Sequence, residues 1–408
     1  MESTGDFIKL ADRLDLLPPY LFGRLNRIKQ EKRSQGIDVI DLAMGNPNDP
    51  TPRAVVDKLC DVVRDSRNHR YSVASGISNL RREISRYYEN QYEVSLRPES
   101  DVICTIGSKE GVSHLSLALL GPGDTVLVPV PAFPIHIYSA VIAGASVLPV
   151  PVEDDEILLQ TVDTLCRDNR PVPKVLFLNY PHNPTTKTVS LPFFEEAIRL
   201  AKKHRFVIVH DFAYGRVTFD GYEAPSLLQV PGAGEVAVEF GTLSKSYNMA
   251  GWRVGYCVGN PKIVEALGKI KGYYDYGLFQ AIQIASIIAL RDCGEFIGKQ
   301  AKIYEKRRDV LCDGLNAMGW EVEKPKASMF VWTRIPEPFR KMGSLDFSIS
   351  LIEEAEVVVS PGIGFGSEGE GYLRIALVEN EHRIRQALRQ MKRVMNGPVG
   401  KVAEASSY

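Results

Sequence analysis

The sequence predicts an α/β fold with a large three-layer domain around a mostly parallel sheet, and a smaller α+β domain built from both chain ends. Apolar, strand-like runs alternate with helix-like segments from about residue 53 to residue 292. This alternation is typical of a parallel sheet that is covered by helices on both faces. A chain of 408 residues with 44% apolar content is also long enough to form about two domains with buried cores.

The expected elements follow one another in a regular order. Strands are predicted at residues 124–129, 145–152, 174–178, 206–211, 235–240 and 255–259. Ligands of such folds bind at the carboxyl ends of the strands, so we expect the site there. A charged helix at residues 300–309 follows in the small domain. The expected domains are residues 53–295 (large) and residues 1–52 with 296–396 (small), followed by a flexible tail at residues 397–408.

Composition and charge exclude several classes of function. A net charge of -1 provides no basic excess for nucleic acid. No run approaches the roughly 20 apolar residues of a membrane span, and the N-terminus lacks the apolar core of a signal peptide, so we expect a cytoplasmic protein without a membrane partner. The six cysteines form no Cys-x-x-Cys pair and the seven histidines form no cluster, so we expect reduced thiols and no metal site.

One lysine stands out in the run Gly241-Thr-Leu-Ser-Lys-Ser-Tyr-Asn-Met-Ala-Gly-Trp-Arg-Val-Gly-Tyr256. Lys245 follows a predicted strand, lies among small and hydroxylic residues, and precedes Arg253 by eight positions. An amine that captures an aldehyde must be held neutral at the tip of a rigid element, near dipoles and cations that lower its pKa. Taken alone, a lysine between two serines is usually a solvated loop residue.

Polar residues also follow two other apolar strands. Asp211 ends the strand at residues 206–211, where an unpaired carboxylate is hard to solvate and needs a cationic partner. The run Asn179-Tyr-Pro-His-Asn-Pro-Thr185 follows the strand at residues 174–178. On its own, this run could be an ordinary turn that contains proline. Both segments nevertheless end at the edge of the sheet where a site is expected.

A glycine turn before an apolar, helix-like run predicts an anion site. The backbone amides of Ser108 and Lys109 would point from the N-terminus of this helix towards a phosphate. The hydroxyls of Thr242 and Ser244 and the guanidinium of Arg253 would complete a phosphate cup. A plain helix start explains the glycine equally well when it is considered alone.

In this order, the motifs resemble those of fold-type I pyridoxal phosphate (PLP) enzymes, the aspartate aminotransferase superfamily. The resemblance covers nearly the whole chain. It implies that Lys245 binds PLP covalently and acts as general base and acid, and that Asp211 pairs with the protonated pyridine nitrogen. It also implies that Asn183 and Tyr214 hydrogen-bond the phenolic oxygen of the cofactor.

The resemblance assigns further residues to the ring, the substrate and a partner subunit. It implies that Phe133 stacks on the pyridine ring, and that Arg374 binds the substrate α-carboxylate in a site shared with Asn183 and Gly45. It implies that Tyr71 reaches the cofactor phosphate of the other subunit of a homodimer, so that the active sites are shared. Plainer alternatives are packing for Phe133 and Tyr71, and a surface ion pair for Arg374.

Several runs look similar to bacterial alanine-forming glutamate-pyruvate aminotransferases: Gly-Ser-Lys-Glu-Gly, Pro-Lys-Ala-Ser-Met and Ser-Pro-Gly-Ile-Gly-Phe-Gly. We therefore expect a ping-pong transfer from glutamate to pyruvate. Diaminopimelate or aspartate aminotransferase, or a PLP-dependent β-lyase, remain alternatives. A catalytically idle PLP-binding regulator would be expected to carry an additional DNA-binding module, and the sequence shows no basic extension for one. One departure is that residues 183–187 lack the glycine common after Asn-Pro-Thr.

The segment at residues 269–277 bears on the preferred substrate. Aspartate aminotransferases place a partner-subunit arginine there to bind the second substrate carboxylate, but this segment contains no arginine. Lys271 falls at the corresponding place and would bind the γ-carboxylate of glutamate less selectively than a guanidinium. The alternative is an ordinary solvated lysine near the end of a helix.

Overall fold

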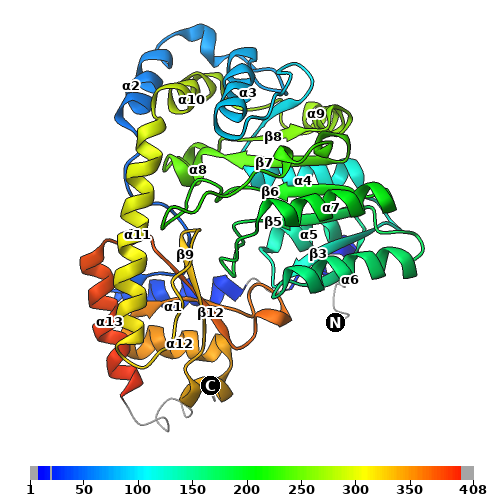
Figure 1. Ribbon diagram of the computed structural model, residues 1–408. Helices are drawn as coiled ribbons and strands as arrows, with labels where there is room; N and C mark the ends of the chain where they lie inside the picture. Colours follow the sequence, from blue (N-terminus) through cyan, green and yellow to red (C-terminus); the bar gives the residue numbers. More distant parts are fainter. Residues whose placement is uncertain (1–7, 19–20, 397–408) are drawn as a thin grey trace, which may run out of the picture.

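The computed structural model describes residues 8–18 and 21–396, and its largest sheet has seven strands (Figure 1). The strand order is β2-β8-β7-β6-β5-β3-β4. The strands are β2 (Val102–Thr105), β3 (Thr125–Val130), β4 (Ser146–Pro151), β5 (Val175–Asn179), β6 (Val207–Asp211), β7 (Ala237–Thr242) and β8 (Gly255–Gly259). Only β8 among them runs antiparallel to its neighbours, β2 and β7. The prediction of a mostly parallel sheet is confirmed.

Helices cover both faces of this sheet because its inner strands are largely apolar and buried. Along β5, Leu176 and Leu178 pack into one core, while Val175 and Phe177 pack into another. This alternation follows from the two-residue period of a strand. The first core includes α6 (Asp155–Asp168) and α7 (Leu191–His204), and the second includes α4 (Ser108–Leu119), α5 (Pro134–Ile142) and α9 (Pro261–Tyr274).

Local sequence signals define the ends of several of these helices. The side chain of Asp154 caps α6 by accepting a hydrogen bond from the Ile157 amide. Asn260 caps α9 in the same way, and Pro261 occupies its first position, where a missing N–H costs nothing. These caps fix where α6 and α9 begin.

A second unit combines both ends of the chain. Strand β1 (Ile40–Asp41) pairs in parallel with β10 (Val357–Val358), and β12 (Tyr372–Ala376) lies between β11 (Ser360–Pro361) and β9 (Phe330–Arg334). Its helices are α1 (Leu21–Ser34), α12 (Ser344–Ala355) and α13 (Glu381–Met395). Leu25 of α1 shares a core with Ile352 and Val358, so the N-terminal segment completes a unit formed mainly by C-terminal residues.

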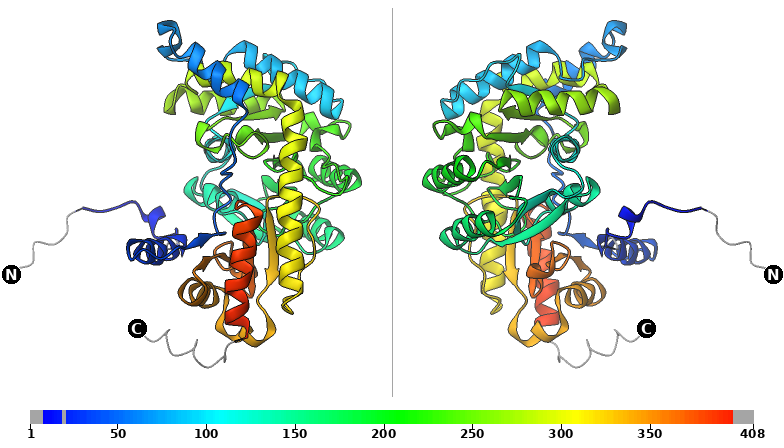
Figure 2. Two further views of the ribbon diagram at one scale, coloured as in Figure 1. Left: turned by 90° about the vertical axis from the view of Figure 1, so that its left-hand side faces the viewer. Right: turned by 90° about the vertical axis from the view of Figure 1, so that its right-hand side faces the viewer.

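One long helix, α11 (Gly294–Asn316), extends from one unit to the other. Its first turn contributes Ile297 to a core with α2 (Arg53–Val62), α3 (Ser78–Tyr92) and α10 (Gln280–Asp292). Its last turns contribute Leu311 and Leu315 to the core of the second unit. In the side views of Figure 2, α13 lies alongside the lower part of α11.

Two expectations about organisation are not tested by this architecture. The domain boundaries near residues 52 and 295 stay a prediction, and the expected flexible tail at residues 397–408 lies outside the described residues. Among the helices of residues 8–18 and 21–396, none is long and apolar enough to cross a membrane.

Candidate active site

A cavity of about 310 Å³ lies where the central strands end and faces the second unit. Asn179, Asp211 and Thr242 are the last residues of β5, β6 and β7 and line its floor, which agrees with the rule for open α/β sheets. Twelve of the residues expected at the site line this cavity: Gly45, Ser108, Lys109, Phe133, Asn183, Asp211, Tyr214, Thr242, Ser244, Lys245, Arg253 and Arg374.

Lys245 lies on the single helical turn α8 (Leu243–Ser246), which directly follows β7. The hydroxyl of Thr242 caps this turn by accepting a hydrogen bond from the Ser244 amide at 3.2 Å. The Lys245 Nζ donates to the carbonyl of Gly45 at 2.6 Å. Burial, together with the nearby guanidinium groups of Arg374 and Arg253, lowers the pKa of Lys245 to about 8. A much larger fraction of this amine is therefore neutral near neutral pH than for an exposed lysine, as nucleophilic and basic roles require.

Asp211 is held rigidly at the end of β6. Its Oδ2 lies 3.1 Å from Nε2 of His136, and its Oδ1 accepts a hydrogen bond from the Ala213 amide at 3.2 Å. His136 is buried and stacks on Phe177, with ring centroids 6.0 Å apart. The carboxylate thus keeps a fixed orientation and faces a cavity that could receive a cationic partner.

His136 was not anticipated by the sequence analysis, although a signal was present. It lies three residues after Phe133, in the first turn of α5, where the other positions are apolar or proline. Positions three apart lie on the same face of a helix. A histidine on the face that carries Phe133 could therefore have been connected with the site.

The anion-binding end is formed by the start of α4 and the segment after α8. Gly107 has φ of +78°, and a side chain there would collide with the guanidinium of Arg253. Arg253 connects this turn with the segment after α8, since its Nη2 donates to Ile106 O at 3.5 Å and its Nη1 donates to Ala250 O at 3.0 Å. The amides of Ser108 and Lys109 begin a helix of 12 residues, so an anion here meets both amide donors and a guanidinium.

At the opposite end, Arg374 projects from β12 between two aromatic rings. Its guanidinium carbon lies 4.0 Å from the ring centroid of Phe330 and 4.5 Å from that of Phe365. Its Nη1 donates to Asn183 Oδ1 at 2.7 Å, and its Nη2 donates to Ala43 O at 3.0 Å. The planar fork is therefore oriented before any ligand arrives, which suits bidentate binding of a carboxylate.

Gly45 and Tyr214 complete the walls near the lysine. A side chain at Gly45 would collide with the ring of Phe330, so glycine permits the backbone to approach the cavity closely. The Tyr214 ring packs edge-on against Phe330 with centroids 5.6 Å apart, and Lys245 Nζ lies 5.9 Å from the Tyr214 ring centroid. Burial raises the pKa of Tyr214, so its hydroxyl stays protonated and can act as a hydrogen-bond donor.

Two residues expected at the site lie outside this cavity. Tyr71 is 92% exposed, and its ring lies 5.7 Å from that of Tyr276. Lys271 is completely buried, and its Nζ contacts Glu110 Oε1 at 3.0 Å and Asp275 Oδ2 at 2.9 Å. An ammonium that is enclosed and paired with two carboxylates of its own chain cannot also meet a substrate, so the structure argues against the proposed substrate contact of Lys271.

The sequence matches the aminotransferase class I and II family over residues 37–391, and the chain belongs to this family. It is therefore an aminotransferase. It is 52% identical over 380 residues to the glutamate-pyruvate aminotransferase AlaC of Escherichia coli K12, covering 93% of this chain and 92% of that protein. It is 40% identical over 385 residues to the LL-diaminopimelate aminotransferase of Moorella thermoacetica, covering 94% and 98%.

Solved structures with the same architecture include the substrate-bound BacF of Bacillus subtilis. Its TM-score is 0.87 at 32% identity, covering 95% of this chain and 98% of that one. A single mutant of the aspartate aminotransferase of Thermus thermophilus also has a TM-score of 0.87, at 27% identity, covering 95% and 100%. The expectation of an aspartate aminotransferase type of fold is confirmed.

Proposed function

We propose that this aminotransferase uses PLP to transfer the amino group of glutamate to pyruvate, giving 2-oxoglutarate and alanine. The observation that carries the proposal is the convergence of Lys245, Asp211 and Arg374 on one cavity from three separate parts of the chain. The substrate pair is supported by the 52% identity to a protein named for this reaction. A cytoplasmic location remains part of the proposal.

The polar groups of the cavity match the chemical groups of PLP one by one. A buried carboxylate, Asp211, suits a protonated pyridine nitrogen, and the start of α4 with Arg253 suits a phosphate. The amine of Lys245, with its lowered pKa, suits the aldehyde. The Tyr214 hydroxyl and the Asn183 amide are suited to the phenolic oxygen, and Phe133 to the flat face of the ring.

When bound, PLP supplies an electron sink that stabilises negative charge at the substrate Cα. The residues of the chain then have distinct tasks. Arg374 binds the α-carboxylate, and the rings of Phe330 and Phe365 on either side of its guanidinium exclude water. The Lys245 Nζ would act as the general base at Cα of the amino donor in the first half-reaction, and as the general acid at Cα of the new amino acid in the second. It would act as base and acid within each half-reaction, so that it carries no proton over from one to the other. Asp211, oriented by His136, keeps the pyridine nitrogen protonated.

The proposal includes a homodimer because one surface of the chain exposes large aromatic side chains. The relevant residues, which we call the aromatic surface, are Tyr71, Tyr273, Tyr274, Tyr276 and Phe279. Their exposed fractions range from 39% for Phe279 to 92% for Tyr71. Exposed apolar patches of this kind mark interaction sites. In a two-fold dimer, Tyr71 would extend from this surface to the phosphate end of the partner's cavity.

Donor and acceptor assays on the PLP-loaded protein test this function. We expect glutamate with pyruvate to give a higher kcat/KM than LL-diaminopimelate or aspartate as amino donor. A higher value for LL-diaminopimelate would favour the alternative suggested by the relative from Moorella thermoacetica. Release of pyruvate from a β-substituted amino acid without any 2-oxo acid, at a rate above transamination, would instead identify a β-lyase. Lys245→Ala serves as the inactive control.

A further inference from the structure

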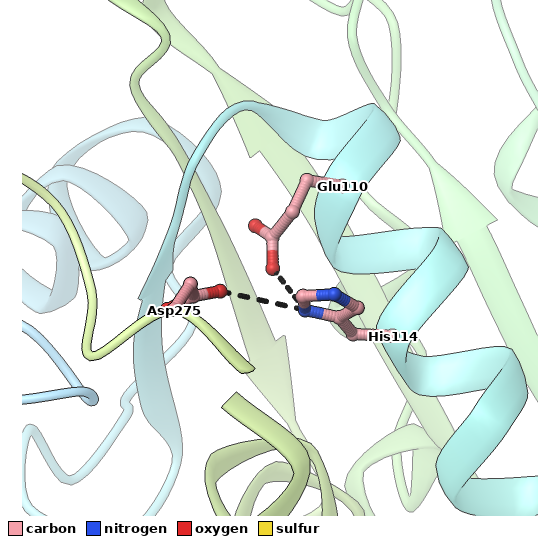
Figure 3. A group of neighbouring side chains, drawn as sticks. All are labelled: Glu110, His114 and Asp275. Carbon is pink, nitrogen blue, oxygen red and sulfur yellow. Dashed lines mark ion pairs between the residues drawn. The ribbon is translucent and has the colours of Figure 1, made fainter. Parts of the chain in front are cut away.

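A compact group of charged side chains lies beside the phosphate end of the cavity, at the contact between α4 and α9. Figure 3 shows three of them, Glu110, His114 and Asp275, with His114 Nδ1 3.5 Å from Asp275 Oδ2 and close to Glu110 Oε1. The ammonium of Lys271 contacts both carboxylates. Carboxylates and an imidazole gathered in this way suit a cation, and here that cation is the Lys271 ammonium.

On one side, this group stabilises the turn that forms the phosphate end of the cavity. Glu110 is the third residue of α4, and its Oε2 accepts a hydrogen bond from the Ile106 amide at 2.7 Å. This bond closes the turn from residue 106 to residue 108, which presents the amides of Ser108 and Lys109. Although burial opposes ionisation, hydrogen bonds from His114, Lys271 and the Ile106 amide lower the pKa of Glu110 to about 2. Glu110 is therefore a permanent anion that needs its ammonium partner.

On the other side, the same group stabilises the loop that carries part of the aromatic surface. Asp275 Oδ1 accepts a hydrogen bond from the Gly277 amide at 2.6 Å, which fixes the loop after α9. This loop packs closely on the segment that follows Tyr71, because a Cβ at Gly277 would lie 2.8 Å from the Val73 carbonyl oxygen. Tyr276, between Asp275 and Gly277, contacts the ring of Tyr71.

We propose that Lys271 is a positioning residue that connects the phosphate-binding turn of its own chain with the loop that supports Tyr71. Through Glu110 it fixes the amides of Ser108 and Lys109, and through Asp275 it fixes Tyr276 against Tyr71. Because Tyr71 would serve the partner's site, the inference rests on the proposed function. It predicts that Lys271 contributes to cofactor affinity without touching the cofactor.

A charge-preserving substitution distinguishes this role from a general contribution to folding. Lys271 forms ion pairs with Glu110 and Asp275, and His114 and the ring of Tyr274 lie beside these carboxylates. Lys271→Met leaves the two carboxylates without their cation, whereas Lys271→Arg keeps a cation between them.

The test is PLP binding to the apoprotein, followed by absorbance, with the wild-type protein as reference. We expect Lys271→Met to bind PLP about tenfold more weakly, because the charge-assisted hydrogen bonds to the two carboxylates are lost. Lys271→Arg should bind within about threefold of the wild type. The matched control is Lys269→Met, on the exposed side of the same helix, and it should bind like the wild type.

A second readout does not depend on cofactor. The apoprotein dimer of Lys271→Met should dissociate at a higher protein concentration in sedimentation than that of Lys269→Met. If Lys271→Met does not fold, Lys271→Met/Asp275→Asn removes one cation and one anion together, and its PLP affinity and dimer affinity should still fall. Wild-type PLP binding and association in the folded variants, or an equal loss in Lys271→Met and Lys271→Arg, would overturn the inference. Failure of the wild-type protein itself to bind PLP would instead overturn the proposed function.

Discussion

Replacing Lys245 by methionine should stabilise the apoprotein, because the lysine is placed for chemistry at a cost in folding free energy. Burial, together with Arg374 and Arg253, lowers its pKa from 10.5 to about 8. The folded protein therefore binds fewer protons than the unfolded chain between these two pH values. The penalty is fully present below about pH 8 and disappears as pH rises towards 10.5.

The magnitude follows from this difference in pKa. A shift from 10.5 to about 8 corresponds to a penalty of about 3 kcal/mol at neutral pH. The methionine variant also loses the hydrogen bond from Nζ to Gly45 O, and this loss offsets about 1 kcal/mol of the stabilisation gained by removing the penalty. We therefore expect Lys245→Met to raise the free energy of unfolding by about 2 kcal/mol at about pH 7, and this gain to shrink by about 1 kcal/mol by about pH 9.

Urea unfolding of the two apoproteins at equal protein concentration measures this difference. The quantity to follow is the free energy of unfolding of the variant minus that of the wild type, measured as a function of pH. Effects common to both proteins cancel in this difference. Lys269→Met, at an exposed position of α9, is the control and should show a difference close to zero throughout. The reasoning is refuted if Lys245→Met is less stable than the wild type at about pH 7, or if its advantage does not decline with pH.

Three further predictions concern the loaded enzyme. Arg374→Lys should lower kcat/KM for every amino acid substrate by about 100-fold, because an ammonium cannot reproduce the planar fork, and an unchanged value would argue against carboxylate binding. Asp211→Asn should retain PLP but reduce kcat by about two orders of magnitude or more, since a neutral amide does not favour the pyridinium form; full turnover with glutamate would exclude that role. Tyr71→Phe should weaken PLP binding by about tenfold while sedimentation still detects a dimer, through loss of one hydrogen bond to a charged group. Wild-type affinity in this variant would remove Tyr71 from the phosphate site.

Residues at the ends of the parallel strands could be placed from sequence because the fold brings those ends together. Asp211 ends β6 and Lys245 follows β7, so a correct assignment of the strands is sufficient to bring them to one edge. Arg374 comes from a different sheet, and only its family motif connected it with Asn183, which it contacts across 191 positions of the chain.

Lys271 shows where sequence reasoning failed. Its surroundings contain other lysines, which favoured a solvated position, but it lies four residues after Leu267 and eight after Ile263 on the buried face of α9. That spacing could have indicated burial. The partner Glu110, 161 positions earlier, could not be identified from the pattern, because the pairing depends on how α9 packs against α4. The short strand β2 was missed because its four residues carry little periodicity.

The most direct test of the function is to follow nitrogen from glutamate to pyruvate. The PLP-loaded protein is mixed with ¹⁵N-labelled glutamate and unlabelled pyruvate, and the products are identified by mass spectrometry. The account predicts ¹⁵N-alanine and 2-oxoglutarate in equal amounts, with ping-pong kinetics, and no label transfer by Lys245→Ala. Absence of labelled alanine in the wild-type protein, under conditions in which the labelled nitrogen passes from glutamate to another 2-oxo acid, would contradict the assignment of pyruvate as the acceptor.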